Sequence, residues 1–433
     1  MNRSKVNVAV SWFLIIATIV FIQITIYRKS VDGSSMDSAM NMQMQISGKY
    51  FVGIKQVAGQ SPLFTNRLTQ LEKAFKKIQG RNRYLSNIPI LAEISGREAA
   101  IQELKHMAYD PAGVIDGKNL PLFYTLYSEG SASLDSNQLL VIKGYGWVGR
   151  LALSQDKPDS DPERQAVLKS AFRMVMLLGL LSMMVTAVLI CGVILFIIAI
   201  IYGVKGKIKS HLMMPESTLS VLIETFAIYL VLSTVLPLLV LKFIPGFNGG
   251  VLASIFAGLL PILWPWIRGM EWKAYREAIG WNRGKGIFRE VGAGIAGFIT
   301  GLPLLIIALI VVMILIKITG KTPTHPAVLN LSHSPLFLFL LACIYAPFVE
   351  ETLFRGALYG YLRSSFPWLV SAIISSLIFA ILHPQGWVAI PAIGVIGFNL
   401  STIREWRGSA IASMTAHALN NGSAIMILII SVA

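Results

Sequence analysis

Long apolar stretches constrain the fold of this chain more than any other feature. A helix of about 20 residues is needed to cross the ~30 Å hydrocarbon core of a bilayer. About nine stretches meet or approach that length: 8–27, 172–203, 219–243, 250–267, 291–317, 335–362, 366–386, 388–403 and 409–432. The stretch 388–403 is short and is the weakest of these predictions. We expect an all-α polytopic membrane protein, a bundle of about eight or nine transmembrane helices with an extramembrane insertion after the first helix.

The composition fits that class. Of the 433 residues, 55% are hydrophobic and 14% are charged, whereas a soluble domain has roughly a quarter of its residues charged. The net charge of +15 would suggest a nucleic-acid partner in a soluble protein. Here most basic residues lie in short loops beside apolar stretches, so membrane topology explains them and no nucleic-acid partner is expected. The basic loops 204–211 and 268–290 are assigned to the cytoplasmic side.

We expect four regions along the chain. Residues 1–29 form an N-terminal signal-anchor helix, because the apolar stretch is too long for a typical cleaved signal and no small-x-small cleavage site follows. Residues 30–168 have the composition of a soluble region, and counting crossings places them outside the cytoplasm of, we expect, a bacterial cell. Residues 169–214 supply the second membrane helix and a basic cytoplasmic loop. Residues 215–433 form the main membrane domain.

The region 30–168 shows local structure but no catalytic constellation. Gly96–Met107 predicts a short amphipathic helix, and the stretch from Tyr145 through Leu153 could form a strand. His106 is a lone histidine beside Lys105, which is typical of a solvated helix face. Substrate capture, partner docking and a family-specific insertion all stay open as roles for this region.

Three charged residues interrupt the apolar stretch 335–362, in the run Glu350-Glu351-Thr-Leu-Phe-Arg355. A charge at bilayer depth is expensive and usually marks a functional site. On a helix Glu351 and Arg355 share a face and can pair. Glu350 is rotated by about 100° and is therefore free for a separate task, such as general-base catalysis. Glu224, inside 219–243, either lines the same cavity or reaches water at the cytoplasmic end of its helix.

The next polar residues follow at helical spacing on two further apolar stretches. Phe379 and His383 are four residues apart, as are His417 and Asn421. A histidine and an amide on one face can donate two hydrogen bonds to a developing oxyanion. A rise of 1.5 Å per residue puts Glu350, His383 and His417 at depths of ~20, ~25 and ~14 Å from the cytoplasmic ends of their helices. We therefore expect one shared cavity within the bilayer.

The three motifs Glu-Glu-x-x-x-Arg, Phe-x-x-x-His and His-x-x-x-Asn, in this order and on separate apolar stretches, resemble the CPBP family. These are intramembrane endopeptidases of the CAAX-protease and bacteriocin-processing type, related to the type II CAAX prenyl endopeptidases. The resemblance covers roughly 215–433 and implies an intramembrane protease domain there, acting on a membrane-anchored peptide or protein within the lipid bilayer.

The resemblance also assigns roles to residues of this sequence. It implies that Glu350 and His383 activate the attacking water, and that His417 and Asn421 stabilise the oxyanion. Glu351, Arg355 and Phe379 would support the site. Asn420 lies three residues from His417 and could replace Asn421; the family match favours Asn421, and helical geometry alone does not decide.

Metal dependence is a separate question. Glu350, His383 and His417 would make a His₂-carboxylate set, the ligand pattern of catalytic zinc. The sequence has no His-Glu-x-x-His, and its two cysteines, Cys191 and Cys343, offer no cysteine-based zinc motif. We favour a glutamate-dependent mechanism without a cofactor, with zinc as the alternative.

Two other functions compete with proteolysis. A proton-coupled transporter also uses buried Glu, His and Arg, but it would favour inverted repeats, of which the sequence shows none. A catalytically silent immunity or scaffold protein of the same fold is the other alternative, and the intact motif set argues against it.

Overall fold

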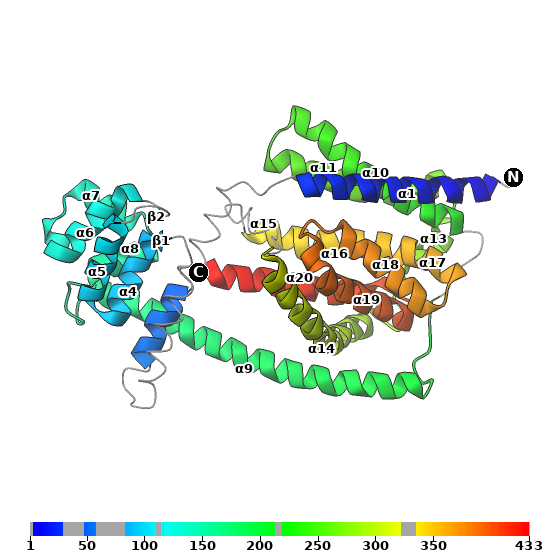
Figure 1. The fold of residues 1–433 in the computed structure, drawn as a ribbon. Coiled ribbons are helices and arrows are strands. Elements are labelled where there is room, and N and C mark those ends of the chain that lie inside the picture. Colours follow the sequence, from blue (N-terminus) through cyan, green and yellow to red (C-terminus); the bar gives the residue numbers. More distant parts are fainter. Residues whose placement is uncertain are drawn as a thin grey trace. The chain divides into compact units, whose positions relative to one another are not determined.

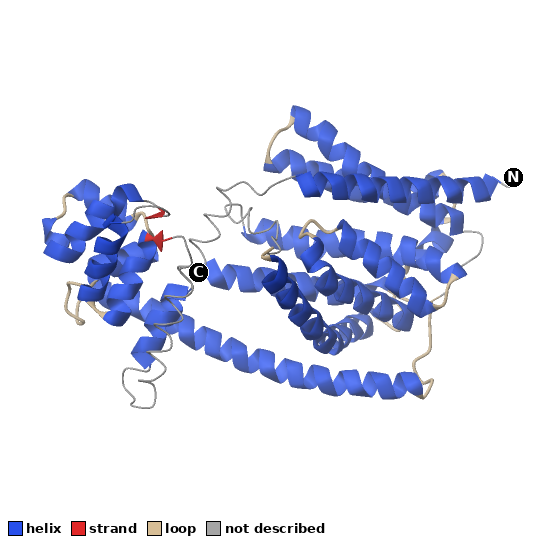
Figure 2. Ribbon diagram, viewed as in Figure 1, coloured by secondary structure: helices blue, strands red, loops and turns tan. Residues whose placement is uncertain are grey.

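The computed structural model describes residues 3–28, 47–57, 83–109, 114–115, 117–212, 219–321 and 335–432. The chain divides into two compact units. Unit 1 comprises Met1–Val31 and Thr186–Ile430, and unit 2 is made mainly of Asp32–Val185. Both consist of helices, apart from one pair of two-residue strands (Figures 1 and 2). This confirms the predicted all-α polytopic membrane protein.

Unit 1 contains the long apolar helices together with several short helices. They are α1 (Arg3–Arg28), the second part of α9 (Pro162–Val204), α10 (Leu219–Phe243), α11 (Phe247–Leu259), α12 (Trp264–Ile267), α13 (Trp272–Ile279), α14 (Ile287–Thr319), α15 (Pro335–Leu340), α16 (Ala346–Glu350), α17 (Tyr359–Ser365), α18 (Trp368–Leu382), α19 (Ile390–Arg407) and α20 (Ala410–Val432). Short 3₁₀ turns occupy Leu260–Leu263 and Trp387–Ala389, and π-helices η8 and η9 occupy Leu341–Tyr345 and Glu351–Leu358.

Seven helical stretches in the described residues are long and apolar enough to cross a membrane. Two of the expected spans fall outside that set. The stretch 366–386 is shortened to the 15-residue helix α18, because the residue before a proline, here His383 before Pro384, is disfavoured in helical conformation. The stretch 409–432 forms the helix α20 (Ala410–Val432).

The core of unit 1 brings together helices that are far apart in sequence. Helices α1 and α10 lie side by side (Figure 1). Ile15 of α1 is fully buried in the same cluster as Phe226 of α10, Leu353 of η9 and Phe379 of α18. The N-terminal helix is therefore part of this core.

Ion pairs hold one end of unit 1 together. Arg363 pairs with Glu405 at 3.1 Å, Arg407 with Glu290 at 2.6 Å and Arg268 with Glu224 at 2.9 Å. The backbone N–H of His211 also donates to the carbonyl of Glu405 at 3.1 Å. The basic segments that the sequence assigned to one side thus meet at one end of the unit. That this end faces the cytoplasm stays a prediction.

Unit 2 is a small helical assembly. Its helices are the segment 47–57, α4 (Ile88–Ser95), α5 (Arg97–Tyr109), α6 (Leu120–Glu129), α7 (Ser136–Lys143), α8 (Trp147–Ser154) and the first part of α9. Three 3₁₀ turns cover Leu85–Asn87, Gly117–Asn119 and Ser131–Ser133. Strands β1 (Arg83–Tyr84) and β2 (Val114–Ile115) pair in parallel.

Helix α5 is the amphipathic helix expected near Gly96–Met107, and His106 is exposed on it. The strand expected over Tyr145–Leu153 is wrong, because most of this stretch is helix α8. Trp147, Val148 and Leu151 are buried together there. Their spacing of one and four residues places them on one helix face, whereas a strand would alternate its buried residues.

Substitution of Gly280 can test how tightly the charged end of unit 1 is packed. Gly280 ends α13 in the left-handed region (φ +84°), and a Cβ there would lie 2.6 Å from the guanidinium carbon of Arg404. Gly206 has a similar conformation (φ +62°) in open space and serves as the matched control. Alanine at either position costs about 1–2 kcal/mol in backbone strain. We expect Gly280→Ala to lose about 1–3 kcal/mol more, from overpacking. Equal losses in chemical unfolding would show that Arg404 moves aside freely.

Candidate active site

The stretch that carries the two glutamates is not a uniform helix. It changes from α15 to η8, then to α16, then to η9, which begins at Glu351, and ends in α17. π-Helical turns are rare and frequent at functional sites. Pro347 lies in the first turn of α16 and has no N–H, so a carbonyl of the preceding turn lacks its helical donor. The Asn421 amide donates to the Ala342 carbonyl of that preceding turn, at 2.8 Å.

Glu351, Arg355 and His417 form a network that is closed to solvent. Glu351 and Arg355 are fully buried, with 3.0 Å between Glu351 Oε1 and Arg355 Nη1. The same oxygen lies 2.8 Å from Nδ1 of His417 on α20. Arg355 also donates to the carbonyl of Gly397 on α19 at 3.1 Å. Glu351 therefore pairs with Arg355, as the spacing predicted, and also contacts His417, which the spacing could not indicate.

His417 lies between two carboxylates. Because an ionised Glu351 can only accept hydrogen bonds, the contact with Nδ1 requires a proton on that nitrogen. The other ring nitrogen, Nε2, faces Glu350 Oε2 at 3.7 Å. This arrangement fixes the orientation of the imidazole.

His383 is held by the end of its own helix. Helix α18 stops at Leu382, and His383 is extended with ψ 136°. Its Nδ1 lies 2.6 Å from the Phe379 carbonyl, which can only accept. The proton is therefore on Nδ1, and Nε2 carries the free lone pair that a general base or a metal ligand requires.

The Phe379 ring joins the three motifs. Its centroid lies 4.3 Å from that of His383, 6.0 Å from that of His417 and 4.4 Å from the guanidinium carbon of Arg355. The sequence indicated only the first of these contacts, from the four-residue spacing. The other two depend on how α18 packs against η9 and α20.

Glu350 differs from Glu351 in its environment. Its side chain is 23% exposed, whereas that of Glu351 is fully buried. The Oε2 atom of Glu350 has no hydrogen-bond partner among the described residues. That atom is itself buried, and Oε2 of Glu351 likewise lacks a partner there, so the difference between the two carboxylates is the partial exposure of the Glu350 side chain.

The two asparagines bond to backbone carbonyls. Asn421 donates to Ala342, as above, and Asn420 donates to Ala416 of its own helix at 3.0 Å. Asn421 therefore connects two helices at the site, while Asn420 makes a local contact. A direct pairing of His417 with Asn421 is not among the contacts of the described residues, and the role of Asn421 at an oxyanion stays a prediction.

Glu224 does not line this site. Its carboxylate accepts from Asn7 of α1 at 2.9 Å, from the Trp264 indole at 3.0 Å and from Arg268. Of the two alternatives that the sequence left open, the position near the helix end is supported, but Glu224 is buried among these partners and does not reach water as expected.

The donor set Glu350, His383 and His417 contains the ligand types that zinc prefers. Within the residues that the structure describes, however, no three His, Cys, Asp or Glu side chains converge as metal ligands. The donor types therefore fit a zinc site, but their arrangement in the described residues does not.

The sequence pattern did not reveal two further contacts of this stretch. The Tyr345 hydroxyl donates to the carbonyls of Ser254 and Ile255 on α11, at 2.7 and 3.1 Å. The Trp281 indole donates to Thr352 at 3.0 Å, directly beside Glu351. Both partners lie far away in sequence, so spacing gave no signal for either.

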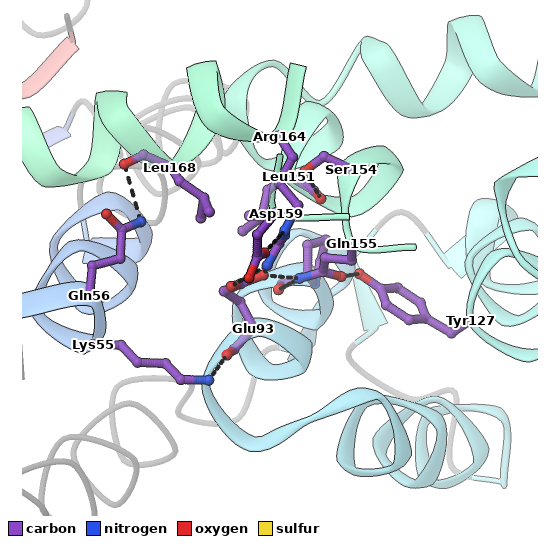
Figure 3. Close-up of polar contacts among 11 residues, drawn as sticks. Lys55, Gln56, Glu93, Tyr127, Leu151, Ser154, Gln155, Asp159, Arg164 and Leu168 are labelled. Atoms are coloured by element: carbon purple, nitrogen blue, oxygen red, sulfur yellow. Dashed lines mark hydrogen bonds and ion pairs between the residues drawn. The ribbon is translucent and has the colours of Figure 1, made fainter. Parts of the chain in front are cut away.

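Unit 2 contains a separate polar cavity of about 250 Å³. Figure 3 shows its centre, where Glu93 accepts two hydrogen bonds from Arg164, at 3.0 and 3.2 Å, and one from Gln155. Tyr127 donates to Gln155 at 2.6 Å. These groups satisfy one another and join α4, α6 and α9. We interpret them as a structural network of unit 2.

Removing one partner of the buried Glu351–Arg355 pair should lower the free energy of unfolding more than removing both partners. Arg355→Met leaves Glu351 as an uncompensated buried charge, which costs about 3–5 kcal/mol. The double variant Glu351→Gln with Arg355→Met removes both charges and should regain a large part of that loss. Unfolding free energies in detergent measure both. A double variant no more stable than Arg355→Met would contradict the pairing.

Residues 332–423 match the family model described as type II CAAX prenyl endopeptidase Rce1-like. No curated protein and no solved structure matched the chain. Residues 332–423, which carry all three polar motifs, thus resemble the Rce1-like family, in agreement with the predicted resemblance to CPBP endopeptidases.

Proposed function

We propose that this protein is an intramembrane endopeptidase that hydrolyses a peptide bond of a membrane-associated protein or peptide. The family match of residues 332–423 supports protease activity and a membrane-associated substrate at the family level. One observation supports the chemistry most directly: Glu350 and His383 each present a free acceptor atom, while His417 is fixed beside Glu350.

In the proposed mechanism, Glu350 and His383 act as the general base. A water oxygen attacks the carbonyl carbon of the scissile bond, and its proton passes to the Glu350 carboxylate or to Nε2 of His383. The carbon–nitrogen bond then breaks, and the proton is delivered to the leaving amine. This division of tasks follows from environment, because Glu351 is fully buried and held by Arg355 and His417, whereas the side chain of Glu350 is partly exposed.

His417 would stabilise the oxyanion. Glu351 holds Nδ1 of His417, and a proton on Nε2 would form a hydrogen bond to the negative oxygen of the tetrahedral intermediate. The second N–H of Asn421 would add a donor from the same helix face. Glu351, Arg355 and Phe379 act by orienting these groups.

We further propose that the site works without a metal. The two candidate bases need no metal to activate water, and the possible zinc ligands are not gathered as a set in the described residues. The chain is an integral multi-pass membrane protein. We propose the bacterial cytoplasmic membrane as its location, with residues 30–168 outside the cytoplasm as a substrate-capture or partner-docking region.

Glutamine substitutions test the general base. Glu350→Gln and His383→Gln should each reduce cleavage by about 10²–10⁴-fold, the usual contribution of general acid–base catalysis. Comparing the membrane proteomes of cells that carry wild type or Glu350→Gln identifies fragments that depend on the enzyme. Glu277→Gln, at an exposed carboxylate of α13, is the matched control.

Two results would overturn parts of this proposal. Wild-type fragment patterns in both Glu350→Gln and His383→Gln, with normal expression, would contradict the proposed catalytic base. Inactivation of the purified enzyme by a chelator, reversed by added zinc, would contradict the metal-free mechanism and leave the protease assignment intact.

A further inference from the structure

The end of helix α18 leaves backbone carbonyls that need donors. Since the last four carbonyls of any helix have no partner within it, each must be satisfied by other groups. At this helix end the Phe379 carbonyl contacts His383 Nδ1 at 2.6 Å, and the Ala380 carbonyl accepts from the His383 backbone N–H at 3.2 Å. The next carbonyl, that of Ile381, accepts from a side chain of a different helix.

That donor is Gln23 of α1. Its Nε2 lies 2.5 Å from the Ile381 carbonyl, across 358 residues of sequence. In an apolar environment a carbonyl without a hydrogen-bond donor destabilises the fold, so a donor from a neighbouring helix stabilises this position. The contact lies two residues from His383.

The rest of α1 packs against unit 1 in a way that supports this contact. Ser11, Ile15 and Thr18 are buried along one face of the helix. At the other end of α1, Asn7 donates to Glu224 at 2.9 Å. Helix α1 is therefore tied to unit 1 at two ends, by a different polar side chain at each.

We infer that Gln23 is a positioning residue for His383, and that α1 is a working part of the catalytic unit in addition to any targeting role. Without Gln23, the free Ile381 carbonyl would compete for the same donors that satisfy Phe379 and Ala380, and one of those donors is the His383 ring. Reorienting that ring moves the lone pair of Nε2. The expected effect on kcat rests on the proposed function, whereas the contact between Gln23 and the Ile381 carbonyl does not.

The inference also bears on processing of the chain. A signal peptidase that released residues 1–29 would remove the donor to Ile381 along with the buried face of α1. On this inference the active enzyme keeps its first helix, and the uncleaved signal anchor stays a prediction.

The test compares Gln23→Met with Asn7→Leu in the full-length protein. Methionine keeps the length of glutamine but cannot donate. We expect Gln23→Met to lower kcat by about ten-fold, since a misplacement of ~1 Å can cost on the order of 100-fold. KM should change little, and the acidic limb of the pH–kcat profile should shift, because the contacts of His383 set its protonation. Asn7→Leu, at the other end of α1, should lower stability and leave kcat and the pH profile unchanged.

Hydrogen exchange gives a measurement that does not depend on proteolysis. Amides of residues 380–386 should exchange faster in Gln23→Met than in wild type and Asn7→Leu. If exchange rises but wild type cleaves nothing, the contact stands and the proposed function fails. If exchange is unchanged, or if Gln23→Met keeps the wild-type kcat and pH profile, the inference is wrong.

Discussion

The buried contact among Glu351, Arg355 and His417 is the constraint on which the rest of the membrane unit depends. Neither charge of the Glu351–Arg355 pair reaches solvent, and an isolated ion at such a site would be prohibitively unstable. The pair therefore requires further partners, which come from α19 through the Gly397 carbonyl and from α20 through His417. Phe379 of α18 covers the guanidinium. One ion pair thus fixes how three helices pack on η9.

Two prolines shape the site by interrupting helices. Pro347 and Pro384 each leave backbone carbonyls without their usual donors. Side chains supply the missing donors: Asn421 bonds to Ala342, His383 to Phe379 and Gln23 to Ile381. Where no water is available, every such carbonyl must be paired, so the interruptions select polar side chains at defined positions. The motif residues are therefore also structural caps.

The sequence predicted which residues form the site better than it predicted the contacts between them. The four-residue spacing of Glu351 and Arg355 predicted their pairing, and the depth estimates predicted that the polar segments meet, as the contacts of Phe379 and His417 show. The π-helical turns, the contact of Glu351 with His417 and the bond from Asn421 to Ala342 were not predicted. These depend on helix rotation and on the local hydrogen-bond register, which a residue pattern leaves free. The error over Tyr145–Leu153 has the same origin, because a short apolar run fits a buried helix as well as a strand.

By itself, the sequence determined that this is a polytopic helical membrane protein. It also determined which charged and polar residues cost free energy when placed in the bilayer, because hydropathy and charge are properties of single residues. Glu350, Glu351, Arg355, His383 and His417 lie within the stretch 332–423 that matches the family model. Only the tertiary structure decided which carboxylate is buried and which is open, since Glu350 and Glu351 are adjacent and chemically identical. Only it connected α1 to the end of α18. Both depend on contacts across long sequence separations, where packing in three dimensions, and not spacing along the chain, selects the partner.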